Sequence, residues 1–179
     1  PLIIQFLKSD KRKKKYSKYL NTEFTNFPKE VLNDKALNFI SIATYDNYHA
    51  NYILQAIKQK KHIFVEKPFC QNISEFNKIR TTLINNKNIC FMSNLLLRNH
   101  PKFLKAYSLI KRGELGKIYH INGEYNYGRL EKINKGWRGK IPFYSVTQGG
   151  AIHLIDLIKW FTKSSVLTVI STSNNISTT

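Results

Sequence analysis

Lys67 is the residue whose place in the sequence most suggests chemistry. It follows the apolar segment His62 to Val65 in the sequence HIFVEKPF, which predicts a buried strand that runs into the charged pair Glu66 and Lys67. Burial lowers the pKa of a lysine and makes it a candidate proton acceptor near neutral pH. The tripeptide Glu66-Lys67-Pro68, taken alone, is better explained by a lysine that only pairs with Glu66 or reaches solvent than by a catalytic lysine.

His153 is the second candidate for proton transfer. A helix over the segment GGAIHLIDLIKWF would place His153 near Asp156 and Trp160, at spacings of three and four residues. A histidine titrates near neutral pH, although a lone histidine on such a face is more often a hydrogen-bonded packing residue. The preceding Gly149 and Gly150 would let a substrate approach the backbone.

Short apolar runs that alternate with helical patterns predict the elements that position Lys67. We expect strands over residues 2–7, 39–43, 62–65 and 89–92, a short strand at Phe24, and helices over residues 11–20, 28–32, 47–59 and 74–84, the last capped by Ser74. This order is typical of a parallel sheet covered on both faces. Ligands bind beyond the carboxyl ends of the strands of such sheets, where Lys67 falls.

The sequence changes character after Pro101. A helix to about Arg112 ends at Gly113, and the segment GELGKIYHINGEYNYGRL then alternates apolar and polar residues as an antiparallel strand does. A helix over residues 151–161 follows. We therefore expect an α/β fold in two parts: a domain with a parallel sheet over residues 1–100, and the start of a second domain over residues 101–179.

The composition argues against several classes of protein. The chain has 179 residues and a hydrophobic content of 42%, which suffices for a buried core. No run approaches the roughly 20 apolar residues of a membrane span, and the first charges follow the first apolar stretch, the reverse of a signal peptide. We therefore expect a cytoplasmic protein without a membrane partner.

The formal net charge of +18 comes mostly from lysines spread along the chain. This spread indicates a compositional bias, and we expect no nucleic-acid partner. The one basic cluster, residues 11–15, predicts the solvated turns of a surface helix, although a role in phosphate binding stays open. Cys70 and Cys90 lie in no metal-ligand spacing, so we expect no metal site.

Several motifs, taken in order, resemble one enzyme family. The segments FISIATYDNYHANYILQAIKQKKHIFVEKPF, NLLLRNHP, GELGKI and GGAIHLIDLIKW are similar to landmarks of the glucose-fructose oxidoreductase and inositol dehydrogenase (Gfo/Idh/MocA) family. The resemblance covers nearly the whole chain and implies an NAD(P)-dependent oxidoreductase that acts on a sugar, cyclitol or nucleotide-activated sugar. It also implies that residues 1–100 are a partial Rossmann-like dinucleotide-binding domain and that residues 101–179 are the start of an α+β open-sheet domain. Family members commonly associate through the open sheet of the second domain, which implies a homo-oligomer when the protein is complete.

The resemblance also implies roles for particular residues. Lys67 and His153 are implied as a catalytic pair that handles the substrate proton between the two domains. The implied cofactor contacts are Lys8, Ser9, Ala43, Thr44, Tyr45, His49, Glu66, Lys67, Pro68 and Asn94. The implied substrate contacts are Lys67, Arg98, Tyr127, Arg138, His153 and Asp156. Trp137 is a further candidate because a sugar suits an aromatic face, although ordinary packing explains it almost as well.

Three departures from the family pattern shape these expectations. The sequence has no Gly-x-Gly-x-x-Gly turn, so we expect a fragment that lacks the first strand and its phosphate site and binds NAD(P) weakly. That strand would lie between the second and fourth strands. The family's Thr-Pro-Asn is Thr44-Tyr45-Asp46 here, and its aspartate four residues before the histidine is Gly149.

The cofactor and the type of reaction stay partly open. Lys8 and Ser9 follow the first predicted strand where NAD-specific enzymes place an acidic residue, which favours NADP, whereas Asp10 keeps NAD possible. A family member that hydrolyses or isomerises sugars with a tightly held cofactor is a second hypothesis. A non-catalytic remnant or regulatory nucleotide-binding protein is a third.

Overall fold

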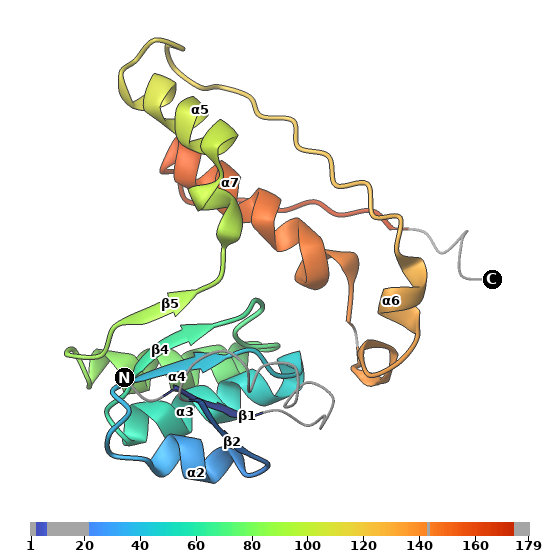
Figure 1. The fold of residues 1–179 in the computed structure, drawn as a ribbon. Coiled ribbons are helices and arrows are strands. Elements are labelled where there is room, and N and C mark those ends of the chain that lie inside the picture. Colours follow the sequence, from blue (N-terminus) through green and yellow to red (C-terminus); the bar gives the residue numbers. More distant parts are fainter. Residues whose placement is uncertain (1–2, 7–21, 143, 174–179) are drawn as a thin grey trace. The chain divides into compact units, whose positions relative to one another are not determined.

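The structure is a computed structural model that describes residues 3–6, 22–142 and 144–173 (Figure 1). It divides into two compact units. The first unit comprises Pro1–Asn94 and Arg129–Ser145, and the second comprises Leu95–Gly128 and Val146–Thr179. The predicted domain boundary between residues 100 and 101 stays a prediction.

Parallel strand pairing organises the first unit. Strand β1 (Ile3–Phe6) pairs with β2 (Thr22–Thr25), and a separate sheet has the order β3 (Phe39–Ile42), β4 (His62–Val65), β5 (Phe91–Ser93). The predicted parallel α/β sheet is therefore confirmed. Within the described ranges β1 and β3 belong to different sheets, and a further strand between them stays a prediction.

One face of the β3–β4–β5 sheet forms the core of the first unit. Its side chains are Ile40, Ile42, Ile63 and Val65, each buried, as the alternation along a strand requires. Helix α3 (His49–Lys58) packs beside α4 (Ile73–Ile84) and buries Ala50, Ile53, Ala56 and Ile57 in the same core. The spacing of these four residues is that of one helix face.

The opposite face of this sheet is open in the described part of the chain. Phe39 and Met92 are each 57% exposed, and Ser41 beside them is exposed too. Coverage on both faces was expected, and for this face it stays a prediction. The helix predicted over residues 11–20 lies outside the described residues.

The short helices of the first unit frame the ends of the strands. Helix α2 (Pro28–Asn33) begins with proline at its first turn, and a 3-10 turn, η1 (Asp46–Tyr48), leads into α3. A later part of the chain adds α6 (Leu130–Asn134) and the 3-10 turn η3 (Arg138–Lys140). The first unit therefore contains residues from two separate stretches of the sequence.

Helix α4 begins one residue earlier than predicted and has a different cap. The side chain of Asn72 accepts a hydrogen bond from the backbone N–H of Glu75 at 2.9 Å, and the Glu75 carboxylate accepts one from the N–H of Gln71 at 2.8 Å. These two bonds satisfy N–H groups that a helix start leaves unpaired. Ser74 lies inside the helix, so the prediction that it is the cap is wrong.

The second unit contains two main helices. The short turn η2 (Leu96–Asn99) precedes α5 (Pro101–Lys111), and a single π-helical turn, η4 (Thr147–Ala151), precedes α7 (Ile152–Thr162). Gly113 follows α5 with a φ of +75°, a conformation that glycine adopts without strain. Both predicted helices are therefore present.

The segment between these helices is not a strand. Residues 116–129 run extended (Figure 1) but carry no strand assignment within the described ranges. The prediction of an antiparallel strand is therefore wrong here, because a strand is defined by a hydrogen-bonded neighbour, which alternation in the sequence does not supply. Among the residues described, no helix has both the length and the apolar character needed to cross a bilayer.

Candidate active site

Three turns meet at the carboxyl-end edge of the β3–β4–β5 sheet. Ile42 pairs with Val65, and Val65 pairs with Ser93, so the residues that follow them start side by side. We call the residues after the three strands the strand-end site: Ala43–Asp46, Glu66–Pro68 and Asn94. Most of the residues predicted to contact a cofactor belong to this set.

Hydrogen bonds between the strands hold the backbone from which Lys67 extends. The N–H of Glu66 donates to the carbonyl of Ile42 at 2.9 Å, and the N–H of Asn94 donates to the carbonyl of Val65 at 2.8 Å. The Asn94 side-chain amide donates to the Glu66 carboxylate at 2.7 Å. Glu66 is therefore tied to the end of β5 through its carboxylate.

The half-buried side chain of Lys67 has a lowered pKa. Burial is the main cause, because loss of water disfavours the ammonium form. The carboxylates of Asp46 and, to a smaller extent, Glu66 oppose the effect and raise the pKa, while Arg138 and Lys132 lower it further. The balance favours a lysine that releases its proton more readily than one in water.

His49 ties together two turns of the strand-end site. Its ring is fully buried, and Nδ1 lies 2.7 Å from the carbonyl oxygen of Pro68 while Nε2 lies 3.2 Å from that of Thr44. Both contacts are to carbonyl oxygens, which only accept, so the one proton of a neutral ring serves a single contact, and we assign it to Nδ1 because that contact is shorter. The ring thus lies between the turn after β3 and the turn after β4, and its predicted contact with a cofactor stays a prediction.

Asp46 and Tyr144 are site residues that the sequence analysis missed. Asp46 is only 5% exposed, and its carboxylate accepts a hydrogen bond at 2.9 Å from the hydroxyl of Tyr144. Burial raises the pKa of that hydroxyl. Asp46 could have been noticed as a carboxylate just after a buried strand, but no local signal connects it with Tyr144.

Arg138, a predicted substrate contact, belongs to the same group of side chains. Its Nε donates to the Tyr144 hydroxyl at 3.3 Å, and its guanidinium lies 4.0 Å from the centre of the Trp137 ring. Trp137 in turn stacks on Tyr45, with 4.7 Å between the ring centres and an interplanar angle of 16°. Contact of Arg138 with a substrate stays a prediction.

His153 lies in the second unit, on the inner face of α7. Its side chain is 8% exposed, and Leu157 one turn later is also buried. The turn before it is tightly packed, because a Cβ on Gly150 would overlap the ring of Tyr125. The glycine therefore accommodates a tyrosine of its own unit rather than open space for a ligand.

Arg98 and Asp156, predicted to contact substrate, bind each other in the second unit. The Arg98 guanidinium donates to the two carboxylate oxygens of Asp156 at 2.7 and 2.6 Å, a fork geometry that suits this pair. The hydrogen bond to Asp156 raises the pKa of Arg98. The guanidinium also lies 5.7 Å from the centre of the Trp160 ring, which stacks on Tyr107.

The remaining predicted site residues are Tyr127, Lys8 and Ser9. Tyr127 is half-buried, and its ring is nearly parallel to that of Tyr125, with 6.0 Å between the ring centres. Lys8 and Ser9 lie outside the described residues. Lys67 and His153 belong to different units, so their joint action on a substrate stays a prediction.

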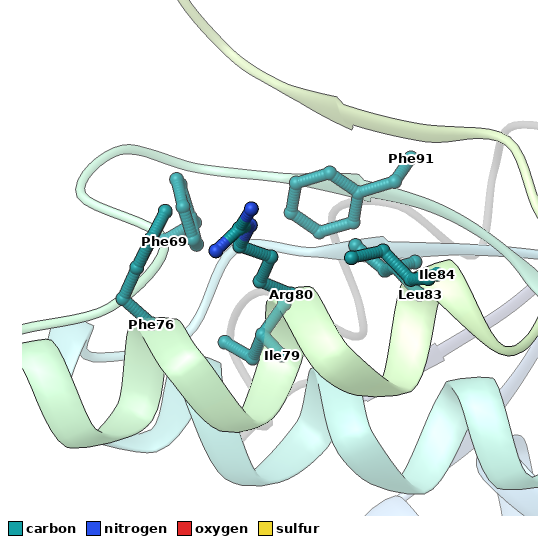
Figure 2. Close-up of a pocket in the computed structure, with 7 residues that line it drawn as sticks. All are labelled: Phe69, Phe76, Ile79, Arg80, Leu83, Ile84 and Phe91. Carbon is teal, nitrogen blue, oxygen red and sulfur yellow. The ribbon is translucent and has the colours of Figure 1, made fainter.

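An apolar pocket of the first unit lies beside α4 (Figure 2). Five residues of α4 line it, Phe76, Ile79, Arg80, Leu83 and Ile84, together with Phe69 and Phe91. Six of these seven side chains are apolar, and none belongs to the strand-end site. The pocket therefore offers no acid or base for a reaction.

Comparison with known families identifies the class of protein. Residues 3–94, more than half of the chain, match the family described as "Oxidoreductase family, NAD-binding Rossmann fold", and residues 103–179 match the one described as "GFO/IDH/MocA C-terminal domain". The parallel sheet and the strand-end site thus lie in the part of the chain that matches this Rossmann-fold family. The chain is a member of the GFO/IDH/MocA family, which confirms the resemblance found in the sequence.

Two similar proteins have names that state a sugar or cyclitol substrate. Levoglucosan dehydrogenase from Pseudarthrobacter phenanthrenivorans is 28% identical over 153 residues, which cover 80% of this chain and 38% of that protein. The structure of myo-inositol 2-dehydrogenase from Lactobacillus plantarum matches with a TM-score of 0.78 and 20% identity over 91% of this chain and 49% of that one.

A third similar protein was solved with ligands. Scyllo-inositol dehydrogenase from Lactobacillus casei, with bound NAD(H) and scyllo-inositol, matches with a TM-score of 0.73 and 21% identity over 90% of this chain and 48% of that one. At such identities the structural matches show the fold. The chain spans well under half of the length of the curated relatives it matches.

Proposed function

We propose that the complete protein to which this chain belongs is an NAD(P)-dependent dehydrogenase of a sugar or cyclitol, with Lys67 as its acid-base residue. The observation that carries the proposal is a half-buried lysine with a lowered pKa at the carboxyl-end edge of a parallel sheet, where ligands of such sheets bind. The dehydrogenase names of the relatives support the reaction class.

The strand-end site suits the nicotinamide end of the cofactor. Ala43 and Tyr45 are exposed there, and Lys67 is half-buried beside them, so a planar ring has both an accessible surface and a neighbouring amine. Asn94 and Glu66 hold the backbone of the site in place. When bound, the nicotinamide supplies the acceptor for the hydride that leaves the substrate carbon.

Lys67 handles the proton of the reaction. The neutral amine accepts the proton of the substrate hydroxyl at Nζ while the carbon that bears this hydroxyl is oxidised to a carbonyl. The resulting ammonium stabilises the negative charge that develops on the substrate oxygen. The lowered pKa increases the neutral fraction at working pH. In the reverse direction the same ammonium returns the proton.

A substrate panel tests the proposal. The complete protein should reduce NAD(P) in a one-to-one ratio with the carbonyl product formed from an inositol, levoglucosan or a related sugar. Product formation without net cofactor reduction would instead support hydrolysis or isomerisation with a retained cofactor. Stoichiometric cofactor binding without any product across the panel would support the regulatory alternative.

We propose NADP as the preferred cofactor. The support is the sequence after the first strand, where Lys8 and Ser9 precede Asp10 and could bind a 2'-phosphate that a carboxylate would repel. The ratio of kcat/KM for NADP and NAD should therefore favour NADP and fall in a Lys8→Ala variant. A clear preference of the unsubstituted protein for NAD would contradict this assignment.

Two further expectations concern the state of the complete protein. The family resemblance favours a homo-oligomer, and the composition favours the cytoplasm with a small molecule as the main partner. Light scattering on the purified complete protein measures the first, and a monomer across the working concentration range would contradict it.

A further inference from the structure

Residues 129–145, here called the cover segment, belong to the first unit although most of that unit precedes residue 95. Their most distant link is the hydrogen bond from the Tyr144 hydroxyl to Asp46, which joins residues 98 positions apart in the sequence. Arg138 in the same segment donates to the Tyr144 hydroxyl from the other side. The cover segment is thus bonded to the turn that follows β3.

Aromatic stacking makes a second attachment to the same turn. Tyr45, the residue before Asp46, stacks on Trp137, and the Arg138 guanidinium lies over that indole ring. Trp137 also meets the ring of Tyr144 edge-on, with 6.3 Å between the ring centres. Stacked and cation-π contacts of this kind add to the area buried, so adjacent residues of the turn hold adjacent parts of the cover segment.

The buried carboxylate of Asp46 requires such partners. A carboxylate that is 5% exposed is costly unless hydrogen bonds and opposite charge compensate it. Tyr144 supplies the hydrogen bond, and among the charged groups that act on Lys67 the carboxylate of Asp46 has the largest effect. Asp46 therefore acts on two sides, on the cover segment and on the lysine.

We propose that Asp46 is a positioning residue that fixes the cover segment, through Tyr144, at the strand-end site from which Lys67 extends. The role of Asp46 in a reaction rests on the proposed dehydrogenase function, whereas the attachment itself does not. The basic residues Lys132 and Arg138 of the cover segment add positive charge that lowers the pKa of Lys67. Asp46 offsets that charge.

Hydrogen exchange of the complete protein tests the attachment. Tyr144→Phe removes only the hydroxyl, and we expect amide exchange in residues 129–142 to rise roughly two- to tenfold, as expected for the loss of one ordinary hydrogen bond. Tyr48→Phe is the matched control, because Tyr48 has an exposed ring on the same 3-10 turn. Peptides from α5 serve as an internal reference, and equal exchange in Tyr144→Phe and Tyr48→Phe would overturn the attachment.

Amine labelling across a pH series tests the effect on Lys67. The groups that act on this amine are Asp46, Glu66, Arg138 and Lys132. Asp46→Asn keeps the size of the side chain but removes a negative charge that raises the pKa of Lys67, so the midpoint of labelling at Lys67 should move to lower pH. An unchanged midpoint would overturn the positioning role, and peptide-level mass spectrometry separates Lys67 from other lysines.

These readouts separate the inference from the proposed function. Neither exchange nor labelling requires turnover, so both can succeed in a protein that shows no dehydrogenase activity. If activity is found, Asp46→Asn should shift the pH profile of kcat in the same direction as the labelling midpoint. A loss of activity at all pH values with an unshifted midpoint would indicate a merely structural residue and contradict the inference.

Discussion

At the scale of single residues, the place of Lys67 just after a buried strand could be predicted from sequence, whereas its chemistry stays a prediction. An apolar strand that ends abruptly in Glu66 and Lys67 is a local pattern, and its position at the sheet edge follows from the strand order. The partnership of Asp46 with Tyr144 could not be predicted in this way. It depends on a contact between residues 98 positions apart, which no local pattern encodes.

The lowered pKa of Lys67 leads to a prediction for the pH dependence of catalysis. In the oxidation direction the amine must be neutral, so kcat/KM should rise with pH and level off above the pKa of Lys67 in the enzyme–cofactor complex. Because burial lowers that pKa, the midpoint should fall below the ordinary lysine value of 10.5. Lys67→Arg should abolish this rise of kcat/KM with pH, since a guanidinium stays protonated.

The pH profile is measured with saturating cofactor and a fixed substrate. The control is the pH profile of Lys58→Arg. Lys58 is exposed on α3, so its substitution should leave the midpoint unchanged. If kcat/KM rises with pH in the Lys67→Arg variant as it does in the unsubstituted protein, the titration belongs to another group.

At the scale of elements, the sequence predicted a strand or helix well where local residue patterns mark it. Strands β3 and β4 and helix α5 were placed to within about a residue or two, because short apolar runs and a helix-starting proline mark them. Residues 116–129 were predicted as a strand from alternation alone. Pairing with a neighbour decides that assignment, and it is a property of the whole fold.

The cap of α4 gives a stability prediction. Asn72→Ala removes the side chain that accepts the Glu75 N–H and should lower the free energy of unfolding by about 1 kcal/mol. Ser74→Ala should change it by well under ~0.5 kcal/mol, since Ser74 is exposed inside the helix. Urea unfolding of the two variants makes the comparison, and a larger loss in Ser74→Ala would restore the original prediction for the cap.

At the scale of the whole molecule, the order of the sequence does not determine which residues group together. The cover segment follows a helix and an extended segment of the second unit, yet it belongs to the first. Residues 129–145 were expected within the second domain, and that division of the chain stays a prediction. The family assignment was accessible because its motifs are short, local and ordered.

Joint action of Lys67 and His153 is a prediction about the complete protein. If both serve one proton-transfer step, the double variant Lys67→Ala/His153→Ala should lose little more kcat than the worse single variant, because residues that act as a unit are not additive. Steady-state kinetics of the three variants, with cofactor affinity measured in each, makes the comparison. Losses that multiply would show that the two residues act independently.

The turnover of Lys67→Ala tests the central claim most directly. With the complete protein and a substrate found in the panel, we predict that kcat falls by roughly 100- to 10,000-fold, the usual contribution of a general acid-base group, while cofactor affinity is largely retained. The matched variant Lys58→Ala, at an exposed position of α3, should keep its turnover. Near-normal turnover in Lys67→Ala would contradict the account and leave Lys67 as a lysine that only pairs with neighbouring carboxylates.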